Sequence, residues 1–100
     1  MSVLITFTVK GDVAKFRESL RDRADEFAAI ADRAKEAGAI HHRFGLGDEF
    51  VLVVDEWESA EQFESFFANP ELQAFIGSVG GAGGAPDITV TEAIDSPDQF

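Results

Sequence analysis

The chain contains no cysteine and no tyrosine, and it has a single tryptophan among its 100 residues. The absence of cysteine excludes a disulfide framework, a thiolate nucleophile and a cysteine-based zinc or iron–sulfur centre. No apolar run approaches the ~18 residues that a membrane-spanning helix needs, and the N-terminus lacks the basic and apolar regions of a secretory signal. The composition therefore predicts a cytoplasmic protein without a membrane partner.

Basic residues are also scarce. Lys and Arg together number 8 against 19 Asp and Glu, which gives a formal net charge of −11. The few cations are scattered along the chain, so no basic stripe is available to bind phosphate backbones or anionic lipid. Nucleic acid is therefore not expected as a partner, and the acidity is explained more simply by solubility than by specific cation binding.

What remains has the pattern of one small domain, which we expect to span residues 1–95 and to be followed by a short acidic tail, 96–100. Residues 3–9 (VLITFTV) have the period-two alternation of a strand with one apolar face. Residues 39–45 and 49–57 read as two further strands joined by a hairpin, and residues 88–94 read as a fourth.

Two helical regions separate these strands. From Asp12, a candidate N-cap, to Gly38, a candidate C-terminal glycine, apolar residues recur every three or four positions, which predicts one long amphipathic helix. Ser59 and Gln62 have capping-box spacing, and the pair at 69–70, Asn followed by Pro, predicts that the second helix restarts there. The order β-α-β-β-α-β is that of a ferredoxin-like α+β fold with a four-stranded antiparallel sheet.

The glycine-rich segment 77–86 does not fit a phosphate-binding loop. Such a loop follows a strand and precedes a helix, whereas this segment follows a helix and precedes a strand, and it has no Gly-Lys-Ser/Thr motif. We therefore expect a flexible connection that covers a cavity or a subunit edge.

His41 and His42 are the only histidines of the chain. Neighbouring side chains on a strand point to opposite faces, so the two imidazoles cannot chelate one metal ion together, and we expect no metal site. Matching of apolar faces places His42 under the helices. The remaining helix-facing residues by this assignment are Ile5, Phe7, Val9, Ile40, Phe44, Phe50, Leu52, Val54, Ile88 and Val90.

The same assignment leaves a mixed polar and apolar face on the other side of the sheet. Its members are Thr6, Thr8, His41, Arg43, Val51, Val53, Asp55, Trp57, Thr89 and Thr91. It requires a three-residue hairpin loop at 46–48, because a two-residue turn would pair odd positions with even ones and exchange the roles of the two histidines.

Two roles remain open for His42. A neutral histidine on an apolar face is most often a satisfied core polar group, and the alternative is a general base in a pocket. Trp57, at the end of a strand, is likewise explained either by interface packing or by a role at a site.

Residues 50–75 (FVLVVDEWESAEQFESFFANPELQAF) resemble the strand–turn–helix signature of the antibiotic biosynthesis monooxygenase family, and the similarity extends over roughly residues 3–94. The resemblance implies a homodimer in which two ferredoxin-like sheets close back to back into an α+β barrel. It also implies cofactor-independent oxidation of aromatic molecules as one activity of the family, alongside haem degradation and lactone isomerisation.

The residues favour some branches of that family over others. The haem-degrading branch uses an Asn on the first strand, a Trp at the end of the third and a His on the second helical region, and only Trp57 has a counterpart here, so haem degradation is disfavoured. The polyketide-oxidising branch uses Tyr, Asn, Trp and Arg. The chain has no Tyr, which leaves Trp57, Arg43 and a histidine, His42 or His41, as candidate catalytic groups.

Three functions follow as hypotheses. The chain is a cofactor-independent monooxygenase in which His42 removes an acidic proton from a small aromatic or apolar molecule, or it is a non-catalytic protein that binds such a molecule, or it is a purely structural dimer whose cavity is filled by its own side chains. A cavity of ~300 Å³ or more discriminates binding from a filled core. The expected pocket lining is Phe16, Phe27, Phe44, Phe63, Phe66 and Phe75.

Overall fold

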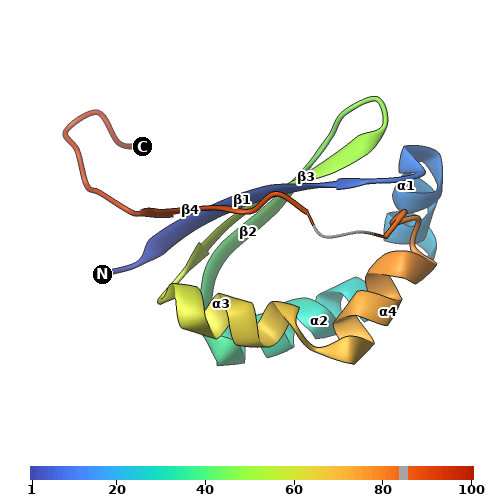
Figure 1. Cartoon of the computed structure of the whole chain (residues 1–100), viewed down its shortest axis with the longest axis horizontal. Helices are drawn as coiled ribbons and strands as arrows, with labels where there is room; N and C mark the ends of the chain where they lie inside the picture. Colours follow the sequence, from blue (N-terminus) through green and yellow to red (C-terminus); the bar gives the residue numbers. More distant parts are fainter. Residues whose placement is uncertain (84–85) are drawn as a thin grey trace.

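The computed structural model describes residues 1–83 and 86–100. Within these ranges, four strands form one antiparallel sheet in the order β2-β3-β1-β4 (Figure 1). The strands are β1 (Val3–Lys10), β2 (Ala39–Leu46), β3 (Phe50–Trp57) and β4 (Thr89–Glu92). The predicted α+β class and ferredoxin-like order are therefore confirmed. Residues 84 and 85 of the glycine-rich segment lie outside the described residues.

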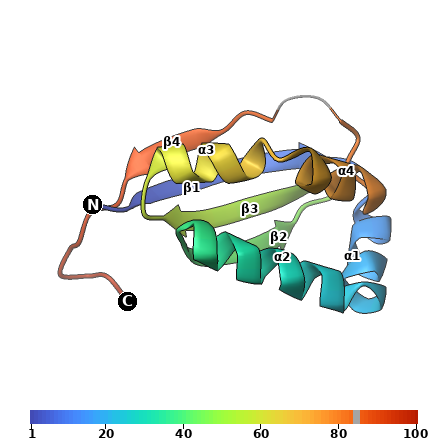
Figure 2. The same cartoon turned by 90° about the horizontal axis from the view of Figure 1, so that it is seen from below.

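The helices lie on one face of the sheet, which we call the inner face; the other is the outer face (Figures 1 and 2). They are α1 (Val13–Asp22), α2 (Ala24–Ala37), α3 (Ala60–Phe67) and α4 (Pro70–Ser78). No helix in the described part of the chain is long and apolar enough to cross a membrane.

The prediction of one long helix over residues 13–37 is wrong, because the helix breaks at Arg23 (φ −121°, ψ 31°). A continuous helix of that length would extend ~37 Å at 1.5 Å per residue, whereas an eight-residue strand spans only ~27 Å. The break lets α1 turn across the end of the sheet while α2 follows the strands (Figure 2).

The capping signals of the sequence are confirmed at four helix ends. The Asp12 side chain accepts from the Lys15 backbone N–H at 3.0 Å, Ser59 accepts from the Gln62 N–H at 3.2 Å, and Asn69 accepts from the Glu71 N–H at 2.8 Å with Pro following it. Gly38 ends α2 with φ +123°, a left-handed conformation that glycine adopts without strain.

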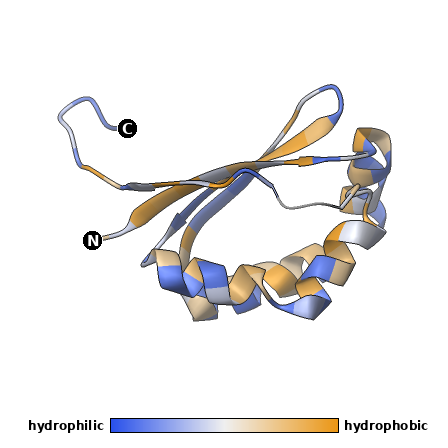
Figure 3. Cartoon of the chain, in the orientation of Figure 1, coloured by the Kyte–Doolittle hydropathy of each residue, from blue (hydrophilic) through white to orange (hydrophobic). Residues whose placement is uncertain are grey.

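The core forms between the inner face and the helices. One buried cluster joins Ile5 and Phe7 of β1 with Val53 and Trp57 of β3 and with Phe63 of α3. A second contains Phe16, Val51 and Val79. Figure 3 shows hydrophobic residues along the strands and on the helices, with hydrophilic ones at the β2–β3 turn.

The predicted orientation of β3 is wrong. Phe7 pairs with Val53, and Ile5 pairs with Asp55, so the odd-numbered residues of β3 share the inner face. Val53 is 6% exposed, whereas its neighbour Val54 is 43% exposed on the outer face. Because β3 has apolar residues in both phases, the alternation in its own sequence did not decide between them.

The fourth strand is shorter than predicted, Thr89–Glu92 rather than 88–94. Beyond it, the segment from Ile94 to Phe100 leaves the sheet, and both of these residues are exposed (Figure 1). The division into a domain at 1–95 and a tail at 96–100 stays a prediction.

Candidate functional site

A cavity of about 410 Å³ lies between the inner face of the sheet and the helices. Its volume is within the ~300–1,000 Å³ range of small-molecule sites. Its wall is almost entirely apolar, and it includes alanines and isoleucines of α2 and α4 as well as aromatic rings. Six phenylalanines expected from the sequence are on its lining: Phe16, Phe27, Phe44, Phe63, Phe66 and Phe75.

The aromatic side chains support one another from different elements. Phe16 of α1 lies edge-on to Phe44 of β2, with ring centroids 5.0 Å apart, and Phe27 of α2 lies edge-on to Phe75 of α4, also at 5.0 Å. Such edge-to-face pairs add about 0.5–1.5 kcal/mol beyond the area that they bury. The rings therefore form a packed wall around the cavity instead of filling it.

Three polar side chains meet on this wall. The Nδ1 atom of His42 lies 2.6 Å from Oδ1 of Asp55, and the Trp57 indole N–H donates to Oδ2 of the same carboxylate at 3.0 Å. Asp55 is 7% exposed and Trp57 is 2% exposed, while the His42 side chain remains 43% exposed. All three line the cavity, so a buried carboxylate holds an accessible imidazole at an apolar pocket.

The β2–β3 hairpin produces this meeting. The Gly47 N–H donates to the Phe50 carbonyl at 2.9 Å, which closes a two-residue turn at Asp48 and Glu49. His42 consequently pairs with Asp55, and Phe44 pairs with Val53. The predicted three-residue loop is therefore wrong. The two-residue turn places the odd-numbered residues of β3 on the inner face instead of the even-numbered ones, and His42 stays on the inner face as predicted.

Asp55 was not among the candidate site residues predicted from the sequence, because the predicted orientation of β3 placed it on the face opposite His42. A charged residue in a buried strand is rare unless it is paired. One sequence feature could have indicated Asp55: it is two residues before Trp57 at the end of an apolar strand, so the two side chains share a face, and the preceding strand carries a histidine.

The other two candidates lie elsewhere. Arg43 pairs with Val54, is exposed on the outer face, and does not line the cavity, so the structure does not bring it to His42. His41 pairs with Glu56 and is exposed at the cavity rim. A register shift between Ala39 and His41 leaves Ile40 without a partner in the ladder.

At the α1–α4 end of the cavity, the described residues 80–82 of the glycine-rich segment bond to the chain between β1 and α1. The Asp12 N–H donates to the Gly80 carbonyl at 3.0 Å, and the Ala82 N–H donates to the Lys10 carbonyl at 2.9 Å. A Cβ atom on Gly11 would lie only 2.0 Å from the Gly80 oxygen, so this close approach of two backbones requires glycine. Gly80 and Gly81 line the cavity.

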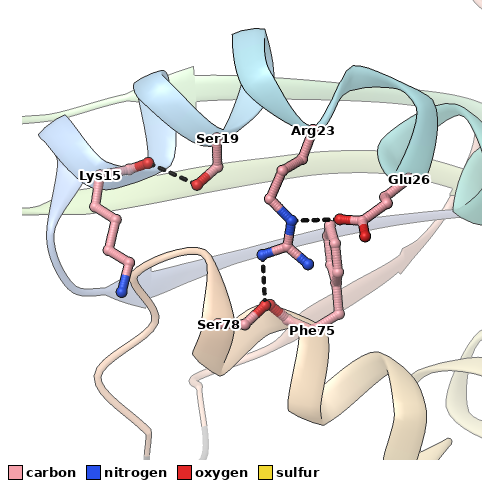
Figure 4. A network of polar contacts seen from close by, with 6 residues as sticks. All are labelled: Lys15, Ser19, Arg23, Glu26, Phe75 and Ser78. Atoms are coloured by element: carbon pink, nitrogen blue, oxygen red, sulfur yellow. Dashed lines mark hydrogen bonds and ion pairs between the residues drawn. The ribbon is translucent and has the colours of Figure 1, made fainter.

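Arg23 fastens α4 beside the same end (Figure 4). Its Nη1 donates to the Ser78 hydroxyl at 2.9 Å, and its guanidinium carbon lies 4.7 Å from the centroid of the Phe75 ring. Its Nε donates to Glu26. The break between α1 and α2 thus places a cation against α4, whose Phe75 forms part of the cavity wall.

Among the described residues, no three His, Cys, Asp or Glu side chains gather into a group that could hold a metal ion. Every buried side-chain nitrogen or oxygen in that part of the chain has a hydrogen-bond partner. The polar chemistry of the cavity therefore centres on His42, Asp55 and Trp57.

The comparison with known proteins identifies the family. Residues 1–78 match the family model described as antibiotic biosynthesis monooxygenase, and the chain belongs to that family. No curated protein matches the chain significantly.

Solved structures share the fold at low identity. Rv0793 from Mycobacterium tuberculosis is 13% identical, with 98% of this chain and 100% of that chain covered and a TM-score of 0.61. SnoaB, a cofactor-independent oxygenase from Streptomyces nogalater, is 16% identical, with 98% and 96% covered and a TM-score of 0.59. PA3566 from Pseudomonas aeruginosa is 11% identical, with 94% and 95% covered and a TM-score of 0.60. Similarity at this level extends to the fold alone.

Proposed function

We propose that the protein is a cofactor-independent monooxygenase that binds a small aromatic or apolar molecule in the cavity and removes a proton from it with His42. The observation that carries the proposal is the accessible His42 imidazole, held by a buried carboxylate on the wall of an apolar cavity of about 410 Å³. Membership of the monooxygenase family and the likeness to a cofactor-independent oxygenase support it.

The wall suits a flat, neutral molecule. Phenylalanine rings offer stacking surfaces, and the apolar lining excludes water from the bound molecule, which strengthens its interaction with His42. An anionic substrate would bring its charge near the buried Asp55 carboxylate in a protein of net charge −11, so we expect uncharged substrates.

The proposed reaction begins at a CH₂ group whose carbanion is delocalised through flanking aromatic rings onto a ring ketone, which makes its C–H acidic. His42 takes one proton, and the carbanion transfers an electron to dioxygen and then combines with the superoxide to form a C–O bond. The peroxide takes up the proton from His42 as its O–O bond breaks, and loss of the second CH₂ hydrogen gives a ketone and one water. One oxygen atom enters the product and the other enters water, and the CH₂ carbon supplies all four electrons that reduce dioxygen.

Dioxygen uptake with anthrone, a tricyclic aromatic of this type, tests the proposal. We expect uptake above the buffer and heat-denatured controls, and one ¹⁸O atom per product molecule by mass spectrometry when ¹⁸O₂ is supplied. Binding of anthrone without any enzyme-dependent uptake would contradict the proposal and support the non-catalytic binding protein. Absence of binding would favour the purely structural dimer.

We also infer that the outer face of the sheet joins two copies of the chain. The sequence prediction placed Val51, Val53 and Trp57 on that face, as the apolar residues that a homodimer would bury, but these lie on the inner face. The outer face instead carries Leu4, Phe50 and Val54, each at least 40% exposed, and half-buried Leu52. An apolar sheet face of this kind marks an interaction surface.

A further inference from the structure

Asp55 accepts two hydrogen bonds that constrain where protons lie in the site. An ionised carboxylate has no proton to donate, so both of its partners must be donors. The Trp57 indole nitrogen is a donor in every state, and it occupies Oδ2 at 3.0 Å. His42 Nδ1, 2.6 Å from Oδ1, must therefore carry a proton, although a neutral imidazole is free to hold its proton on either nitrogen.

The proton of this short contact is placed on His42 Nδ1, because both oxygens of an ionised carboxylate can only accept. Neutral His42 is then protonated at Nδ1 and bare at Nε2. No residue in the part of the chain described by the structure bonds to Nε2, and His42 lines the cavity. The bare nitrogen is consequently the one that is free to accept a proton.

We propose that Asp55 is a positioning residue that holds neutral His42 in the Nδ1–H tautomer, so that Nε2 is kept as the proton acceptor of the cavity. This role rests on the proposed function, because the choice of acceptor nitrogen affects a reaction only if a bound molecule gives up a proton. The cavity then selects neutral apolar molecules that present an acidic C–H or an O–H donor to Nε2.

The arrangement predicts an unusual effect of Asp55→Asn. An asparagine keeps the shape but has one acceptor oxygen and one NH₂ donor in place of two acceptor oxygens. Trp57 can only donate, so it takes the oxygen, and the NH₂ group then faces His42 Nδ1. His42 can bond to that group only by losing the Nδ1 proton, which moves the proton to Nε2 and converts the acceptor into a donor.

Removal of the competing indole donor should reverse this effect. In Asp55→Asn combined with Trp57→Phe, the amide can rotate its oxygen towards His42 Nδ1, and the Nδ1–H tautomer becomes available again. A purely structural role of Asp55 predicts no return of the Nδ1–H tautomer in the double variant, because the tautomer would then not depend on which group of residue 55 faces Nδ1.

The experiment is ¹⁵N NMR of the histidine side chains in ligand-free protein at alkaline pH. Two-bond couplings between ring protons and nitrogens distinguish the tautomers. We expect Nδ1–H for His42 in the wild type, Nε2–H in Asp55→Asn, and recovery of Nδ1–H in the double variant. His41, for which the described part of the chain supplies no such carboxylate partner, is the internal control and should show the same pattern in all three proteins.

Activity supplies the second readout. With anthrone as substrate, Asp55→Asn should lower kcat by a factor on the order of 10²–10⁴, since the wrong tautomer removes the general base, and the double variant should regain part of the loss. Nε2–H at His42 in the wild-type spectrum overturns the inference, and this result does not depend on whether any variant folds. The correct tautomer without turnover would instead contradict the proposed function and leave the tautomer assignment intact.

Discussion

His42 and Asp55 lie directly opposite each other on β2 and β3, and their side chains meet on the inner face with Nδ1 2.6 Å from Oδ1. The pairing depends on the two-residue turn, because a register shifted by one residue would carry Asp55 to the outer face. The β2–β3 register that buries Val53 and Trp57 therefore also aligns the His42 imidazole with the Asp55 carboxylate.

Occupation of the cavity by a protein side chain should block binding. Ala31 lines the cavity from α2, so Ala31→Phe should lower the affinity for 1-naphthol, a small neutral aromatic, at least about tenfold, which corresponds to about 1.4 kcal/mol. Isothermal titration calorimetry measures the change. Ala29→Phe, at an exposed position of the same helix that does not face the cavity, is the matched control and should bind as the wild type does. Equal loss in both variants would show that ligands do not use the cavity.

Arg23 should stabilise α4 more than a neighbouring ion pair does. Its contacts with Ser78 and Phe75 are short, and its side chain is partly buried, so Arg23→Ala should lower the free energy of unfolding by about 1–2 kcal/mol and accelerate amide exchange in α4.

The matched control is Arg33→Ala. Arg33 also links α2 to α4, but its contact with Glu71 is 3.9 Å long and exposed, and we expect a loss below about 0.5 kcal/mol. Urea unfolding and hydrogen exchange compare the two variants. An equal or larger effect at Arg33 would contradict the role that we assign to Arg23.

The outer face should be required for dimer formation. Light scattering should give twice the 10.8 kDa chain mass for the wild type, and Val54→Lys should give the monomer mass, because a charge would be buried in the interface. Ser65→Lys, on an exposed position of α3, is the control and should remain dimeric. A wild-type monomer at micromolar concentrations would refute the proposed dimer.

The C-terminal tail is predicted to contribute little to stability. Residues 96–100 are exposed, and their hydrogen bonds are local, such as that between the Ser96 hydroxyl and Asp98 at 2.6 Å. Deletion of these five residues should therefore leave the thermal midpoint nearly unchanged. A large drop would show instead that Phe100 docks on the partner subunit.

The sequence predicted the features that local chemistry decides. Asp12, Gly38, Ser59 and Asn69 mark helix ends because each satisfies backbone groups within a few residues. The break at Arg23 was not predicted, because the apolar periodicity continues through it and the cause is the length of the sheet.

Which side chains of β3 face the helices could not be predicted from the sequence either. Its two faces, one with Val51 and Val53 and the other with Leu52 and Val54, are equally apolar, so the choice is made by packing against β1 and α3. Because of this error, Asp55 was not predicted as a site residue. A carboxylate is expected to be exposed to solvent, and only the fold shows that two hydrogen-bond donors, His42 and Trp57, reach it.

The role of His42 as the base is tested most directly by the rate of anthrone oxidation in His42→Ala, compared with the wild type and with His41→Ala. We predict that His42→Ala remains folded by circular dichroism and loses a factor on the order of 10²–10⁴ in turnover, because it lacks the proton acceptor. His41→Ala should lose far less, since its imidazole is exposed at the rim and has no link to Asp55. Oxidation by His42→Ala at the wild-type rate would contradict the assignment of His42 as the base.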